Sequence, residues 1–182
     1  MIEIRWHGRG GQGAFTAARL LGLAASVMGG KYALAFPSFG PERRGAPVLG
    51  FTKIDDIPIR NRSQITHCDY AVVLDDSLVT PEVFQGLKPG GIVFINTAKP
   101  EAFSTYKQEV VAFDAETTAA RILGRPIVNV AMMAALVAKT GLLTLDACLD
   151  AVDEEFKPEL REKNRAVFKE IYRWIREREK HE

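Results

Sequence analysis

The chain has 182 residues, of which 47% are hydrophobic, so it is long enough for one domain with a sizeable core. Its 24 basic and 23 acidic residues give a net charge of +1, without the strong positive field typical of nucleic-acid-binding proteins. No apolar run reaches the ~18–20 residues of a membrane span, and the first residues have a strand pattern rather than that of a targeting leader. We therefore expect neither a nucleic acid nor a membrane as a partner.

Hydrophobic periodicity predicts strands that alternate with helices. Apolar and polar residues alternate over 2–6, which indicates a first strand, and a helical stripe follows the glycines and ends at Gly29-Gly30. Further strands are expected at 48–54, 70–74, 91–95 and 109–113, and further helices at 81–87, 115–123 and 127–139. This order predicts an α/β fold, three-layer α/β/α with a mostly parallel sheet and the glycine loop after the first strand. We expect a single domain over 1–182, with a helical C-terminal tail at 145–180.

The first strand runs into a glycine-rich loop. Gly8, Gly10 and Gly13 spell G-x-G-x-x-G between a strand and a helix, an arrangement that directs backbone N–H groups and a positive helix end at one point. Phosphate is the usual ligand there. A dinucleotide site would need an acidic residue about 20 positions further on, and none occurs before Glu42. A tight turn without any ligand is the alternative interpretation.

A second loop, FPSFGPERRGAP at 36–47, is dense in proline and glycine. The prolines restrict the backbone, and Phe39 adds a flat apolar face. Arg43 and Arg44 add two forked cations suited to phosphate or carboxylate. The loop is therefore a second candidate for ligand binding. The alternative is a solvated turn whose arginines pair with nearby carboxylates such as Asp55 or Asp56.

The chain shows no catalytic constellation of its own. Its two cysteines, Cys68 and Cys148, are too few for an iron–sulfur cluster and suggest no disulfide framework, which favours a reducing, cytoplasmic location. His7 abuts the glycine loop, but no partner acid or nucleophile accompanies it, so a structural role is favoured. The sequence also lacks a G-D-G motif of the kind that thiamine enzymes use. We expect no catalytic residue and no metal site in this chain.

Several segments together resemble one known family. GRGGQG, FPSFGPERRGAPV, FTKIDDIPIRNRSQI and DYAVVLD are similar to the gamma subunit of 2-oxoacid:ferredoxin oxidoreductases, and so are GLKPGGIVFINT and the tail EEFKPELREKNRAVFKEIY. The ERRGAPV form is most similar to the pyruvate enzyme. One departure is NVAMMAALVAKTG, where Val130 stands at a position at which a threonine would be expected. This substitution puts a polar contact in doubt.

The resemblance implies a subunit that is not active alone. In this family a small α/β gamma subunit joins alpha, beta and delta-type subunits, which hold thiamine diphosphate, magnesium and [4Fe-4S] clusters. The complex reversibly cleaves a 2-oxoacid such as pyruvate, reduces ferredoxin and transfers the acyl group to coenzyme A. By resemblance, the anion at the two loops would be coenzyme A, bound partly by this chain. The site residues implied are Gly8, Arg9, Gly10, Gly11, Gln12, Gly13, Phe39, Arg43 and Arg44.

Other interpretations remain open at this stage. Arg60 and Arg62 are second-rank candidates for the coenzyme, with a contact to a neighbouring subunit as the alternative. The chain could serve a branched-chain or other 2-oxoacid, or it could be a purely structural subunit. A freestanding nucleotide-binding oxidoreductase is a further alternative, which the absence of an acid–base pair disfavours.

Overall fold

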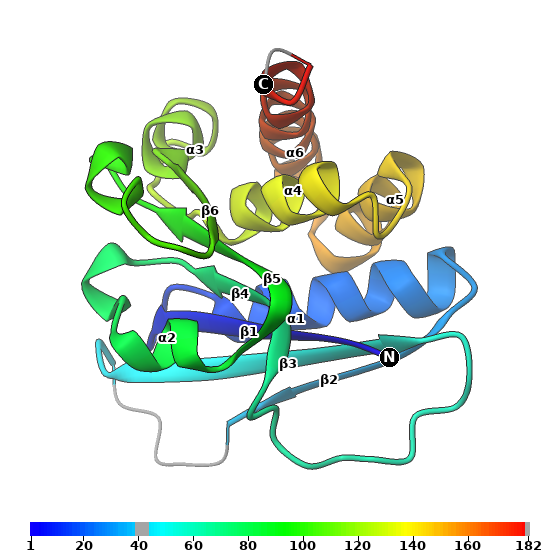
Figure 1. Cartoon of the computed structure of the whole chain (residues 1–182). Coiled ribbons are helices and arrows are strands. Elements are labelled where there is room, and N and C mark those ends of the chain that lie inside the picture. Colours follow the sequence, from blue (N-terminus) through cyan, green and yellow to red (C-terminus); the bar gives the residue numbers. More distant parts are fainter. Residues whose placement is uncertain (39–43, 181–182) are drawn as a thin grey trace.

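A computed structural model describes residues 1–38 and 44–180 of the chain (Figure 1). The described residues form one six-stranded sheet with the order β2-β3-β1-β4-β5-β6. The strands are β1 (Ile2–Arg9), β2 (Tyr32–Pro37), β3 (Pro47–Asp55), β4 (Cys68–Val73), β5 (Leu87–Asn96) and β6 (Glu109–Phe113). β1, β4, β5 and β6 pair in parallel, whereas β3 is antiparallel to both of its neighbours. The expected mostly parallel α/β sheet is confirmed, with one reversed strand inside it.

The helices cover the two faces of the sheet unequally. They are α1 (Ala14–Leu23), α2 (Pro81–Gln85), α3 (Ala115–Leu123), α4 (Asn129–Thr140), α5 (Leu145–Glu155) and α6 (Pro158–Arg178). A π-helical turn, Ala24–Met28, extends α1. The larger core lies between the sheet and α1, α3, α4, α5 and α6, and the C-terminal helices gather on that side (Figure 1). The opposite face has a smaller core under α2, a short 3₁₀ turn (Pro100–Phe103) and the connection 56–67, so the third layer is thin.

The strand β2 was not expected from the sequence. Residues 36–37 were assigned to the long loop, but Phe36 and Pro37 end β2 and Pro47 begins β3, so the two strands form a hairpin. The strand is hard to detect because it lies at the edge of the sheet and ends in proline, which is tolerated there but not in a central strand. The connection between the strands is consequently shorter than the predicted loop.

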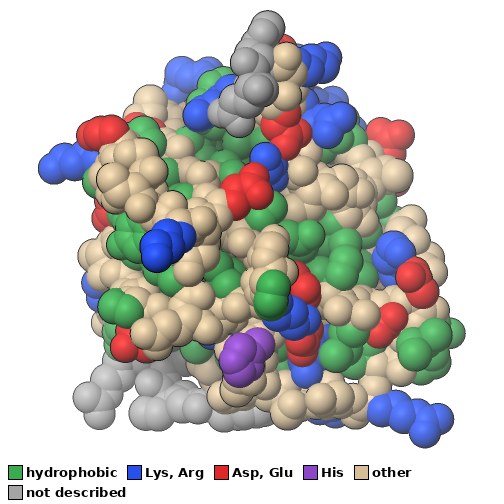
Figure 2. Space-filling view, in the orientation of Figure 1, with side chains coloured by type: hydrophobic (Ala, Val, Ile, Leu, Met, Phe, Trp, Pro, Cys, Tyr) green, Lys and Arg blue, Asp and Glu red, His purple; other side chains and the backbone are tan. Residues whose placement is uncertain are grey.

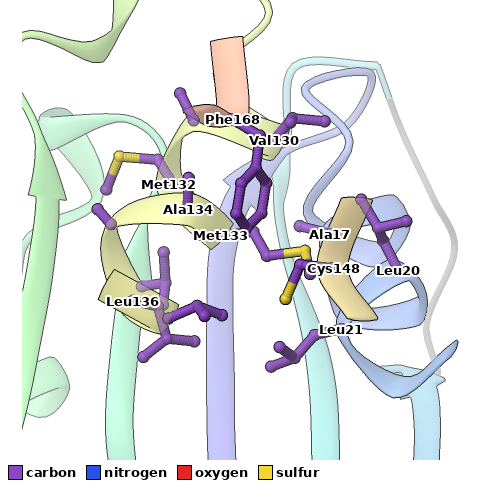
Figure 3. Close-up of a cluster of buried hydrophobic side chains, with 14 of the residues drawn as sticks. Ala17, Leu20, Leu21, Val130, Met132, Met133, Ala134, Leu136, Cys148 and Phe168 are labelled. Atoms are coloured by element: carbon purple, nitrogen blue, oxygen red, sulfur yellow. The ribbon is translucent and has the colours of Figure 1, made fainter. Parts of the chain in front are cut away.

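The helix α4 is the centre of the larger core. Every residue from Asn129 to Ala138 is buried, as its apolar sequence on all sides predicted. Figure 3 shows side chains of α4, among them Met132 and Met133, beside Leu20 of α1, Cys148 of α5 and Phe168 of α6. Because α4 is enclosed by other elements, the position of its N-terminus is fixed by packing on several sides.

The last helix, α6, packs against α4 along one stripe. Val167, Phe168, Ile171 and Ile175 are buried, whereas Leu160, which the periodicity placed on the same stripe, is 45% exposed. Leu160 lies in the first turn of the helix. The tail therefore contributes to the core through its middle and C-terminal turns.

We expect Phe168→Ala to reduce the free energy of unfolding by about 3–5 kcal/mol, because it leaves a cavity beside α4. Leu160→Ala, in the same helix but exposed, should cost less than about 1 kcal/mol. Urea denaturation of the two variants measures the difference. Similar losses for both would contradict the packing of α6 described here.

Candidate functional site

The glycine loop lies at the carboxyl edge of the parallel strands. β1 ends at Arg9, and α1 begins at Ala14. A Cβ atom on Gly8 would lie 3.0 Å from the Cβ of Ala14, so a side chain there would press on the start of α1. Gly11 and Gly13 have positive φ angles of 96° and 82°, which side chains disfavour. The glycines therefore allow a tight turn that brings the positive end of α1 close to the sheet.

The backbone of the second loop joins the glycine loop. The N–H of Gly10 donates to the carbonyl of Ala46 at 2.8 Å, and the N–H of Gly45 donates to the carbonyl of Gly10 at 3.1 Å. These contacts form an isolated parallel bridge between Gly10 and Arg44. The exposed Arg44 is thus held beside the glycine loop, as the hypothesis of a shared site requires. Phe39 and Arg43, also predicted for this site, lie outside the described residues.

The two polar residues of the glycine loop are bound to a carboxylate that the sequence analysis missed. Nε of Arg9 and Nε2 of Gln12 each lie 3.0 Å from Oδ2 of Asp75 and donate to it. The other nitrogens of Arg9 donate to the carbonyl of Gly45 and to Oγ of Ser77, at 3.1 and 2.7 Å. Arg9 therefore links three segments of the chain, and its charge is paired with Asp75.

Electrostatics keep Asp75 ionised. Burial alone would raise its pKa, but hydrogen bonds from Ser77, Gln12 and Arg9 outweigh this effect and hold the pKa below its usual value. The anchor of the loop is therefore charged throughout the neutral range. The signal in the sequence is an acid placed directly after a buried strand, in AVVLDD, since the ends of parallel strands meet at one edge.

A cleft of about 580 Å³ opens beside Gln12 and Asp75. It extends along the same edge of the sheet to the ends of β5 and β6, and no lysine or arginine lines it in the described part of the chain. Its polar lining residues are Gln12, Asp75, Asp76, Asn96, Thr97, Asp114, Glu116 and Thr117. This lining is rich in acceptors, so the cleft suits hydroxyl and amide groups better than phosphates.

Comparison with known proteins gives one consistent result. Residues 3–174 match the family described as pyruvate ferredoxin/flavodoxin oxidoreductase. The pyruvate synthase subunit PorC of Methanothermobacter marburgensis is 50% identical over 165 residues, which cover 90% of this chain and 92% of that protein. The pyruvate/ketoisovalerate oxidoreductases common subunit gamma of Thermococcus kodakarensis is 49% identical over 178 residues, covering 94% and 96%.

A solved structure agrees with these relatives. The crystal structure of the pyruvate oxidoreductase subunit PORC of Thermotoga maritima matches with a TM-score of 0.83 and 34% identity, over 94% of this chain and 95% of that one. The chain belongs to this family. It is a gamma-type subunit of a pyruvate/2-oxoacid:ferredoxin oxidoreductase.

The topology of the gamma subunit argues against a dinucleotide site. In that type of site, the strand after the first helix lies next to the first strand and supplies an acid to the ribose. Here β3 stands between β1 and β2, and no acid ends β2. The glycine loop therefore shares its sequence pattern with dinucleotide-binding proteins but not the neighbouring strand on which their ribose contact depends.

The other candidates from the sequence lie away from this edge. The connection that carries Arg60 and Arg62 leaves β3 at Asp55, whose carboxylate lies 3.4 Å from the terminal amino group of Met1. The two arginines are exposed and lie toward the amino ends of the parallel strands, opposite the glycine loop. Val130, the departure from the expected threonine, has a fully buried apolar environment, in which the valine side chain fits without a polar partner.

Among residues 1–38 and 44–180, no group of three or more side chains could hold a metal ion, and no helix is long and apolar enough to cross a membrane.

Burial and the nearby charge of Arg5 lower the pKa of His7 to about 4, so its ring is neutral at pH 7. On the face in Figure 2, basic and acidic side chains are interspersed, in keeping with the small net charge.

We expect Asp75→Ala to reduce the free energy of unfolding by about 1–3 kcal/mol, because the donors of Arg9 and Gln12 lose their acceptor. Amide hydrogen exchange in the glycine loop should become faster as well. Asp56→Ala is the matched control, since Asp56 pairs with Lys31 at 2.6 Å but its carboxylate is 81% exposed. If both variants lose the same free energy of unfolding, Asp75 does not anchor the glycine loop.

The low pKa of His7 predicts acid destabilisation. When the pH falls below 6.5, histidine gains a proton in the unfolded chain but not in the folded one until about pH 4, so stability falls between these values. The shift corresponds to roughly 3 kcal/mol. We expect His7→Phe to flatten the loss of stability between pH 6.5 and 4 in urea denaturation. His67→Phe removes a histidine whose ring is exposed and is the control. If the free energy of unfolding depends on pH in the same way in wild type and in His7→Phe, the low pKa of His7 is refuted.

Proposed function

We propose that this gamma subunit binds coenzyme A for the oxidative decarboxylation of pyruvate, at the site where the glycine loop meets the second loop, called the arginine loop below for its Arg43 and Arg44. The complex would convert pyruvate and coenzyme A to acetyl-CoA and carbon dioxide and pass the electrons to ferredoxin, reversibly. The observation that carries the proposal is the backbone bridge between Gly10 and Arg44, which joins the two anion-binding candidates into one surface. The same contacts would help to hold the complex together.

Coenzyme A carries its charge as a diphosphate and a separate 3′-phosphate, and the chain offers two kinds of anion site. The N–H groups at the start of α1 would take one phosphate, since no side chain caps this helix end. Arg44 and its neighbour Arg43 would take another, and Phe39 would stack on the adenine. Arg9 is paired with Asp75, so its role is to position the loop.

The acceptor-rich cleft next to Gln12 would bind the uncharged parts of the coenzyme. The one free ribose hydroxyl and the amides of the pantetheine arm can donate to the carboxylates and side-chain amides that line it. No proton transfer or bond cleavage is assigned to this chain, whose part is to bind and orient the acyl acceptor.

The remaining chemistry is assigned to partner subunits. We propose that alpha, beta and delta-type chains hold thiamine diphosphate, magnesium and the [4Fe-4S] clusters and make the contact with ferredoxin. In support, both cysteines of the gamma subunit are buried, and burial raises the pKa of Cys148 to about 12. Thiolates are the form that ligates iron, so neither residue is suited to a cluster.

A second oxoacid is a specific alternative within this proposal. The Thermococcus kodakarensis relative is, by its name, common to pyruvate and ketoisovalerate oxidoreductases. At 49% identity, this chain could be shared in the same way, because it would contact the acyl acceptor and not the oxoacid. Purification of the gamma subunit from its own cells, followed by identification of the co-purifying chains, tests whether it serves one enzyme or two.

We expect replacement of both Arg43 and Arg44 by alanine to raise the KM for coenzyme A by about one to two decades. A hydrogen bond to a charged group contributes ~1.5–3 kcal/mol, which corresponds to that factor. The KM for the 2-oxoacid should stay within about twofold. Steady-state kinetics of the assembled complex, with each substrate varied in turn, measures both constants.

The matched control replaces Arg60 and Arg62 by alanine, which removes the same charge at the opposite edge of the sheet. It should leave the KM for coenzyme A unchanged. If the two double variants behave alike, or if Arg43/Arg44→Ala alters both substrates equally, the coenzyme role is wrong and the arginine loop serves subunit contacts instead.

A further inference from the structure

Asn129, the first residue of α4, lies directly against the glycine loop. A Cβ atom built on Gly13 would stand 2.6 Å from Nδ2 of Asn129 and 3.4 Å from its Cγ. Because Gly13 is the residue before α1, this contact brings the first turns of α1 and α4 together at the carboxyl edge of the sheet. Both helices run away from this point in the same general direction (Figure 1).

The two helix ends lack the usual neutralising groups. Among the six α-helices in the described residues, α1 and α4 have neither a side chain at the N-cap residue that accepts from the backbone nor an acid in the first turn. Thr144 and Asp114, by contrast, cap α5 and α3. Unpaired N–H groups and two positive helix ends therefore converge where Gly13 meets Asn129.

The side chain of Asn129 is largely buried but keeps a hydrogen-bond donor available at the junction. It is only 6% exposed, and its Oδ1 accepts from the N–H of Val130 at 2.9 Å. Its Nδ2 has no acceptor in the part of the chain that the structure describes. Nδ2 is not among the fully enclosed polar atoms, so it reaches solvent and can donate to a ligand that brings an oxygen.

The surroundings restrict what that ligand can be. Phe15, two residues after Gly13, is 37% exposed, and Ile127, two residues before Asn129, is 41% exposed, so each of the two segments that meet at the junction carries exposed apolar surface. The carboxylates of Asp75 and Asp114 line the neighbouring cleft and would repel an anion that entered it. An anionic group is therefore favoured over the helix ends, attached to a partly apolar molecule.

We propose that Asn129 is a ligand-binding residue, whose Nδ2 donates to the diphosphate of coenzyme A over the joined N-termini of α1 and α4. This proposal rests on the proposed function and divides the coenzyme between two places. The helix ends and Asn129 hold the diphosphate, and Arg44 holds the 3′-phosphate. Gly13 is required because any side chain there would occupy the space of the Asn129 amide.

The test compares coenzyme A with 3′-dephospho-coenzyme A as ligands of the assembled complex. Asn129→Asp keeps the acceptor for Val130 but replaces the donor by a negative charge, so the Kd for both ligands should rise about ten- to a hundredfold. Asn129→Ala, which removes the donor without adding charge, should raise both by about three- to tenfold. Arg44→Ala should raise the Kd for coenzyme A about tenfold. It should change the Kd for 3′-dephospho-coenzyme A by less than about twofold.

Asn61→Asp introduces the same charge in the connection between β3 and β4 and is the matched control; it should leave both constants unchanged. The unfolding temperature of every variant separates effects on folding from effects on binding. If Asn129→Asp does not assemble into the complex, the Kd values of Asn129→Ala test the proposal. If the Asn129 variants lower only the unfolding temperature while Arg44→Ala weakens coenzyme A binding, Asn129 has a structural role and the proposed function stands. If Arg44→Ala and both Asn129 variants bind coenzyme A as tightly as wild type, the proposed function fails as well.

Discussion

The carboxylate of Asp75 is the contact on which the arrangement of the site depends. It accepts from Arg9 and Gln12, which belong to the glycine loop, and Arg9 in turn reaches the carbonyl of Gly45 in the second loop. Without this acceptor, Nε of Arg9 and Nε2 of Gln12 would lose their hydrogen-bond partner at the start of α1. One carboxylate from β4 therefore determines where two loops from β1 and β3 lie relative to each other.

Close backbone approach is the second condition for this geometry. A Cβ atom on Gly50 of β3 would lie 3.1 Å from the carbonyl oxygen of Ala14 and 3.2 Å from the Cβ of Ala18, so α1 rests directly on the strand. Gly8 and Gly13 leave similar space on β1 and against α4. These glycines are dispersed in the sequence, but they meet around the first turns of α1 and allow two helix ends to reach one edge of the sheet.

The sequence was informative where local patterns decide structure. The strand at 109–113 and the helix at 115–123 were predicted with the bounds observed, because a short apolar run and a helical pattern mark them. The family was identified from several motifs together, whereas the ligand chemistry assigned to the two loops stays a prediction. The edge strand β2 was missed, because its hydrogen bonds with β3, rather than a strong local pattern, define it.

Residues that act through distant partners could not be found in this way. Asp75 and Arg9 are 66 positions apart, and Asn129 meets Gly13 only when α4 is packed beside α1. The family resemblance implies Arg9 as a site residue, and the structure adds that its Nε pairs with Asp75; a contact of Arg9 with a ligand stays a prediction. Periodicity can place a residue on an element, but only the packing of elements shows which charges are already neutralised.

The separation of charge along the carboxyl edge has a consequence for how a ligand enters. The joined ends of α1 and α4 are positive, whereas Asp75, Asp76 and Asp114 make the adjacent cleft negative. The positive helix ends and the negative cleft are neighbours, so the electric field between them is directed along the edge of the sheet. An elongated molecule with phosphates at one end and neutral groups at the other is aligned by this field, so the polarity of the edge selects one of its two orientations before any specific contact forms.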